Sequence, residues 1–209
     1  MPAGGLPQPR AAAYTPCVTV KKKAIEQNHL TLAFPGLPYG DSRRFALQLL
    51  SSILGSGMSS RLWQQVREKR GLCYTIYSYG AGPADTGPYA VYTALGRETE
   101  AEAIRTIVDT VKAFRDGGVT REELDRAREQ SKANVLMGLE STQARMAHLG
   151  RSELTMGEVL TPDQIIAAYD AVTDDDVRAL AEEMFDFSRA SLSAVGRVRT
   201  ADEYRELLN

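Results

Sequence analysis

The chain has 209 residues, of which 43% are hydrophobic and 25% charged, and its formal net charge is −2. These values are ordinary for a globular protein and allow one large domain or two small ones. Acidic and basic residues are mixed along the chain, which argues against a nucleic-acid-binding face. No apolar run approaches the ~18 residues of a membrane span. Neither nucleic acid nor a membrane is therefore expected as a partner.

The two cysteines, Cys17 and Cys73, are far apart and fit no metal-ligand spacing. A disulfide scaffold is not expected at this chain length and cysteine count. Residues 1–9 lack the charged and apolar regions of a signal peptide. These features favour a reducing compartment, and we expect a bacterial cytoplasmic protein.

The N-terminal part of the chain predicts a tail followed by two strands. Residues 1–14 are rich in Pro, Gly and Ala without periodicity, so we expect a flexible tail or linker remnant ahead of a single domain over 15–209. Residues 18–34 predict two strands, because apolar and smaller or polar residues alternate over 30–34. The sequence PGLPYG then ends the second strand.

Two helices and a hairpin are predicted next. Apolar residues recur at helical spacing over 41–54, and a second, shorter helix is predicted over 59–70. Residues 73–79 and 89–95 are rich in Tyr, Ile, Val and Thr, which is typical of strands. The Gly- and Pro-containing turn at 82–87 predicts that these two strands form a hairpin.

Helices dominate the rest of the chain. Thr120 with Glu123, and Thr161 with Gln164, are capping-box pairs that predict helix starts. The predicted segments are helices over 98–115, 120–139 and 143–151, helices beginning at 161 and at 173, a strand over 190–195, and a last helical turn over 204–208. The order ββααββαααααβ predicts an α+β domain, with an antiparallel or mixed sheet of about four to six strands and helices packed on one face.

The residues that most often carry catalysis form no local motif. His29 and His148 share neither an H-E-x-x-H nor an H-x-x-E-H sequence, so no helix supplies two histidine ligands. Cys73 precedes an aromatic strand and is expected to be a small buried side chain. Residues 174–176 are three acids at a predicted helix start, where they interact with the helix dipole. No nucleophile elbow, P-loop or dinucleotide-binding loop is present.

The segment from Gly57 to Tyr79 is the most informative part of the sequence. A helix is predicted to end at Arg70, with Gly71 in the position of a C-terminal cap. Arg67 lies seven residues before Tyr74, across the corner between helix and strand. Such a corner can aim a guanidinium and a hydroxyl at one point, where both donate to a peptide carbonyl or to an oxyanion forming on it. The alternative is that Arg67 pairs with a surface acid and Tyr74 packs in the sheet.

This segment resembles a family signature in the order of its residue types. The matching residues are Gly57-Met58-Ser59-Ser60-Arg61-Leu62, then Val66-Arg67-Glu68, then Gly71-Leu72-Cys73-Tyr74. They resemble the C-terminal domain of pitrilysin/insulinase-type zinc metallopeptidases, the group that includes the mitochondrial processing peptidases. The resemblance covers about residues 18–197 and implies the half-molecule fold of the LuxS and processing-peptidase-like metalloenzymes.

The resemblance implies a division of labour between two similar α+β halves. In the family, the first half carries zinc on an H-x-x-E-H helix, and the second half supplies an Arg and a Tyr to the substrate. Arg67 and Tyr74 match that pair, so the resemblance implies that they bind substrate near the scissile bond. It implies no catalytic residue and no metal ligand on this chain alone; zinc is expected in the partner half.

Three functional hypotheses follow. The first is the substrate-binding, non-zinc half of a metallopeptidase that hydrolyses peptides or small proteins and is inactive without the H-x-x-E-H half. Its expected partners are a peptide substrate and a zinc-bearing N-terminal half, on the same polypeptide or on a partner subunit. The second is a non-catalytic assembly subunit of the same fold. The third is a free-standing domain that forms a homodimer and binds small ligands.

Overall fold

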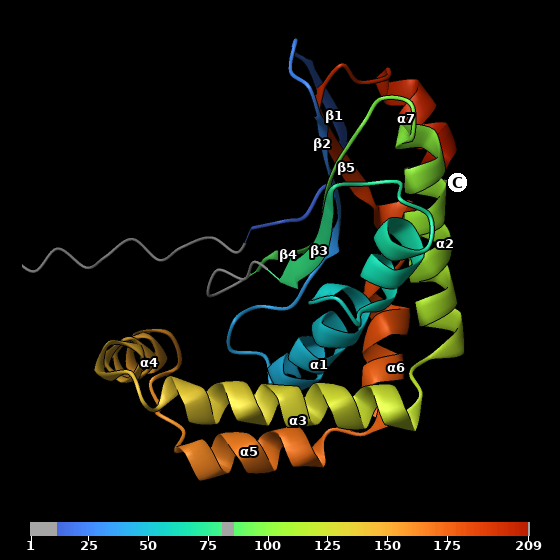
Figure 1. Cartoon of the computed structure of the whole chain (residues 1–209). Helices are drawn as coiled ribbons and strands as arrows, with labels where there is room; N and C mark the ends of the chain where they lie inside the picture. Colours follow the sequence, from blue (N-terminus) through green and yellow to red (C-terminus); the bar gives the residue numbers. More distant parts are fainter. Residues whose placement is uncertain (1–11, 81–85, 209) are drawn as a thin grey trace, which may run out of the picture.

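A five-stranded mixed sheet organises the part of the chain that the computed structural model describes, residues 12–80 and 86–208 (Figure 1). The strands are β1 (Val18–Lys22), β2 (Asn28–Pro35), β3 (Thr75–Gly80), β4 (Pro88–Leu95) and β5 (Ser191–Gly196). Their order across the sheet is β1-β5-β2-β4-β3. Only β1 and β5 pair in parallel, so the predicted mixed sheet is confirmed.

One face of the sheet is covered by helices, as the sequence predicts (Figure 1). The helices are α1 (Arg44–Gly55), η1 (Trp63–Glu68), α2 (Glu100–Gly117), α3 (Arg121–Gly138), α4 (Thr142–Met156), α5 (Pro162–Ala171), α6 (Asp174–Met184), η2 (Phe187–Arg189) and α7 (Ala201–Leu208). The predicted capping boxes at Thr120 and Thr161 are both formed. In the described residues, no helix is both long and apolar enough to cross a bilayer.

The core lies between the sheet and these helices. Along β2, Leu30, Leu32 and Phe34 are buried while the intervening residues are partly exposed, which confirms the predicted alternation. Aromatic rings join the layers, since Phe185 lies edge-on to Phe34 at 5.2 Å and to Phe114 at 6.2 Å between ring centroids. Burial of such side chains is the main stabilising contribution to folding.

Several element boundaries differ from the predicted ones. Helix α1 begins at Arg44 rather than at Asp41, because the Asp41 carboxylate accepts a hydrogen bond from the Arg43 backbone N–H at 2.8 Å in the preceding turn. Helix α4 continues past its predicted end to Met156, and the predicted last turn is the eight-residue helix α7. Strands β3 and β4 pair antiparallel, as predicted for a hairpin.

Parts of two predictions fall outside the described residues. These are residues 1–11 of the predicted tail and most of the hairpin turn, residues 81–85. Tyr14, at the end of the predicted tail, is in contact with the sheet. Its hydroxyl donates to the Ser191 hydroxyl at 2.7 Å or to the Ala33 carbonyl at 3.0 Å.

Candidate functional site

The signature segment is anchored to the core by its apolar residues. Leu62 and Val66 are fully buried, and Trp63 is partly buried against the core. Helix η1 packs against α2 and β3. These apolar residues therefore form the buried face of the helix, and this fixes which of its residues face outward.

The helix that carries Arg67 has a π-type hydrogen-bond pattern. The Lys69 backbone N–H donates to the Gln64 carbonyl at 3.1 Å, five residues back. Gly71 then adopts φ +63°, and the Leu72 N–H donates to the Val66 carbonyl at 3.0 Å. This confirms the predicted glycine cap. The sequence predicts a helix here but not its π form, which occurs frequently at functional sites.

The Arg67 guanidinium lies close to two aromatic rings. Its guanidinium carbon lies 3.9 Å from the centroid of the Trp63 ring and 5.8 Å from that of Tyr74. A guanidinium over an aromatic face gains about 0.5–1 kcal/mol at exposed sites and more when desolvated. The stacking fixes the plane of the guanidinium without using its N–H donors.

Those donors have no protein partner among residues 12–80 and 86–208. Within these ranges the Arg67 side chain forms no ion pair and no hydrogen bond, so it does not pair with a surface acid. Tyr74 is 70% exposed rather than packed in the sheet, and its backbone N–H is fixed by the Ala94 carbonyl at 2.9 Å. The structure thus places Arg67 and Tyr74 side by side, and neither side chain has a hydrogen-bond partner within the described residues. Their role toward substrate stays a prediction.

A second arginine of the signature has a structural role that the sequence did not reveal. Arg61 donates two hydrogen bonds to Glu123, at 2.8 and 2.7 Å, and a third to the Gly118 carbonyl at 2.9 Å. Its guanidinium also lies 4.9 Å from the centroid of the Phe114 ring. The hydrogen bonds from Arg61 lower the pKa of Glu123 to about 2. Arg61 therefore joins the segment just before η1 to the start of α3.

The remaining candidates do not meet at this corner. Cys73 is buried as predicted, and burial raises the pKa of its thiol. On β2, His29 Nδ1 lies 2.6 Å from the Tyr92 hydroxyl, whereas His148 on α4 lies near the Leu160 carbonyl. In the described parts of the chain, no group of three or more His, Cys, Asp or Glu side chains is placed to hold a metal ion. The donor set therefore does not fit zinc.

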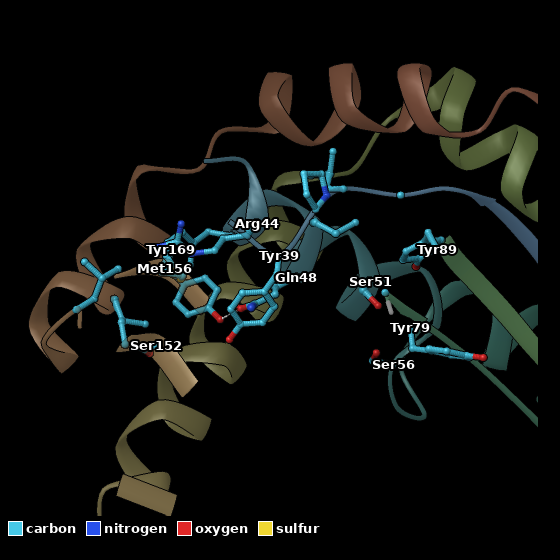
Figure 2. Close-up of a pocket in the computed structure, with 18 of the residues that line it drawn as sticks. Tyr39, Arg44, Gln48, Ser51, Ser56, Tyr79, Tyr89, Ser152, Met156 and Tyr169 are labelled. Atoms are coloured by element: carbon cyan, nitrogen blue, oxygen red, sulfur yellow. Dashed lines mark hydrogen bonds between the residues drawn. The ribbon is translucent and has the colours of Figure 1, made fainter. Parts of the chain in front are cut away.

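Figure 2 shows a pocket of about 580 Å³. It is bounded by α1, α4, α5 and the adjoining ends of β3 and β4, and neither Arg67 nor Tyr74 lines it. On its wall the Tyr169 hydroxyl donates to Gln48 Oε1, and burial raises the pKa of Tyr89 to about 12. The sequence offered no signal for this pocket, because its walls come from segments distant in the chain.

Comparison with known proteins explains the signature. The family model described as "Peptidase M16 inactive domain" matches residues 2–131. The chain belongs to this family. The resemblance stated from the sequence is thereby confirmed, and an inactive domain of this family implies a catalytic partner half.

Curated relatives of this M16 domain are named zinc proteases. An uncharacterized zinc protease of Streptomyces coelicolor is 41% identical over 177 residues, covering 85% of this chain and 38% of the relative. The uncharacterized zinc protease YmxG of Bacillus subtilis is 38% identical over 180 residues, covering 85% of this chain and 44% of the relative. The chain thus spans about two fifths of the length of these relatives.

A solved structure supports the fold. The crystal structure of a peptidase M16 inactive domain from Pseudomonas fluorescens superposes with a TM-score of 0.79 at 22% identity, covering 89% of this chain and 45% of that one. The relatives are named zinc proteases at their full length, whereas the described residues of this chain provide no zinc site.

Proposed function

We propose that this chain is the substrate-binding half of a zinc-dependent metallopeptidase that cleaves peptides or small proteins. The observation that carries the proposal is the Arg67 guanidinium, which is stacked on Trp63, free of any carboxylate in the described residues, and adjacent to the exposed Tyr74. A structural subunit has no need for a fixed arginine whose donors are left open.

The proposed role of the pair is to hold the carbonyl of the peptide substrate. Arg67 has several N–H donors in a planar fork, and the Tyr74 hydroxyl adds one more. Fixed donors aimed at a carbonyl oxygen stabilise the negative charge that develops on it during attack by water. The zinc and the general base are expected on the partner half, on the same polypeptide or on a second subunit.

Substitution of the pair in the assembled enzyme tests the proposal. The chain is co-expressed with the part of the Streptomyces coelicolor relative that lies outside the matched segment, and cleavage of a fluorogenic peptide is measured. Loss of one fixed donor to an oxyanion costs roughly 100- to 1000-fold in kcat in other hydrolases. We expect Arg67→Ala to reduce kcat by about 100-fold, and we expect Tyr74→Phe to reduce kcat as well. The zinc content should not change.

Lys69→Ala is the matched control. Lys69 is exposed, lies just beyond the same helix, and its replacement also removes one positive charge. It should leave turnover unchanged. If Arg67→Ala turns over as fast as this control, the assignment is wrong, and the non-catalytic assembly subunit becomes the better description.

A further inference from the structure

Helix α4 is the least buried of the longer helices of the domain. Among its 15 residues only Ser152 is buried. No other helix or strand in the described residues makes extensive contact with it. In Figure 1 it lies at the end of α3, apart from α2 and α7.

The face of α4 toward the domain is separated from α1 by the 580 Å³ pocket. His148, Ser152 and Met156 line the pocket from the α4 side, and Gln48 lines it from α1 (Figure 2). The pocket leaves α4 attached mainly through its two ends. A helix of this length is marginally stable in water without tertiary packing, and Gly150 in its interior costs about a further 1 kcal/mol relative to Ala.

Helix α4 exposes three large apolar side chains, interspersed with polar and charged residues such as Glu153. Leu154 is 88% exposed, Met146 66% and Leu149 53%, and Leu136 and Met137, at the adjoining end of α3, are exposed as well. These five residues are called the α4 patch. Among the described residues, every exposed large aliphatic side chain except Met58 lies between positions 136 and 159. Such a concentration of exposed apolar side chains marks an interaction surface.

We propose that the α4 patch is the surface on which the zinc-bearing half docks. This inference rests on the proposed function and adds the location of the interface. The curated relatives contain the matched segment within chains more than twice its length. In them the rest of the polypeptide is tethered to this domain at an effective concentration in the millimolar range. Because it is tethered, this part of the polypeptide should occupy an exposed apolar helix in preference to a second, free copy of the domain. The contact also supplies the packing that α4 lacks within its own domain.

Binding measurements on patch variants test the docking surface. The chain is co-expressed with the part of the Streptomyces coelicolor relative outside the matched segment, and the complex is measured by analytical ultracentrifugation and by hydrogen exchange of the α4 amides. We expect a monomer for the chain alone, and a complex in which the α4 amides exchange more slowly. Met146→Glu with Leu149→Glu should weaken the complex by at least tenfold, because the charges oppose desolvation of the patch.

Ala144→Glu is the matched control. It adds one negative charge, half that of the double variant, to the same exposed helix, roughly 200° around the axis from Met146. It should bind as the unchanged chain does, and circular dichroism checks that all variants keep their helices. The proposal is overturned if the patch variants bind normally or if the unchanged chain does not bind. It is also overturned if the chain alone is a dimer that the patch variants dissociate, since a second copy would then be the occupant.

The two proposals fail in different ways in this experiment. Arg67→Ala should form the complex normally and lose turnover, whereas the patch variants should lose the complex itself. Normal binding with unchanged turnover in Arg67→Ala removes the substrate role alone. Normal binding of the patch variants, with turnover still dependent on Arg67, removes the docking surface alone.

Discussion

Two arginines of the same signature segment have different roles because of what surrounds each guanidinium. Arg61 meets the Glu123 carboxylate and the Gly118 carbonyl, so its donors are occupied within the domain. Arg67, six residues later, meets only aromatic rings in the described residues, so its donors are available. The sequence located both residues, but it could not distinguish them. The difference depends on Glu123, which lies more than 50 positions further along the chain.

The Arg61–Glu123 pair should make stability depend on pH in acid. Glu123 has a pKa of about 2 in the folded chain, below its ordinary value of 4.5, chiefly because Arg61 donates to it. The folded state therefore favours the ionised form. The resulting stabilisation is fully present above pH 4.5 and is lost as pH falls from 4.5 toward 2. Glu123→Gln should lower the free energy of unfolding by roughly 1 kcal/mol at pH 7, and this deficit should shrink below pH 4.5.

Urea unfolding of both chains between pH 2.5 and 7 measures that difference, at urea concentrations spanning each transition. Gln still serves in a capping box, so the α3 start is preserved and the substitution isolates the charge. A deficit that stays constant over this pH range would contradict the assignment. Glu122→Gln, at the neighbouring exposed position, is the control and should show little effect.

At the scale of elements, the features that depend on short-range sequence signals were predicted well. Capping boxes join residues three apart, and the Gly71 cap depends on the backbone of one turn, so both are visible in sequence. The π pattern of η1 was not predicted, because it depends on how the helix fits between α2 and β3. The corner that presents Arg67 and Tyr74 thus combines a predictable cap with an unpredictable helical turn.

Gly71→Ala should destabilise the domain through the backbone alone. Gly71 has φ +63°, and a Cβ built on it meets no other atom within 4 Å. The expected loss is about 1–2 kcal/mol, which is the cost of the left-handed conformation for a residue with a side chain. Gly71→Asn should lose less, because Asn adopts this conformation more readily. Thermal unfolding of the three chains measures the order, and an Ala variant as stable as Gly would show that the turn relaxes freely.

At the scale of the whole molecule, the order of elements was predictable and the order of strands was not. Each strand can be predicted from its own residues, but β1 lies beside β5, which is some 170 residues further along the chain. For the same reason, a buried polar cluster built from distant residues could not be predicted from the sequence. Glu100 is fully buried, although the sequence presents it as one more acid at a helix start. Its carboxylate accepts hydrogen bonds from Asn28 on β2 and from Tyr204 on α7.

This cluster should tie the C-terminal segment to the sheet. The Tyr204 hydroxyl donates to Glu100 Oε1 at 2.9 Å, and Arg199 Nε lies 3.3 Å from the same oxygen. Tyr204→Phe removes one donor from a buried carboxylate while keeping the ring. The expected loss is about 1.5–3 kcal/mol, as for hydrogen bonds to charged groups, because the carboxylate is left incompletely satisfied. Tyr79→Phe, at an exposed position, should change stability by less than about 0.5 kcal/mol.

Urea unfolding compares the two variants, and hydrogen exchange locates the effect. Amides of α7 should exchange faster in Tyr204→Phe, because the Tyr204 hydroxyl joins this helix to Glu100 and through it to Asn28. A Tyr204 variant as stable as the Tyr79 variant would show that Asn28 and Arg199 alone satisfy the Glu100 carboxylate. The expected result would instead show that residues 28, 100 and 204, which lie together only in the folded chain, hold the C-terminal segment against the sheet.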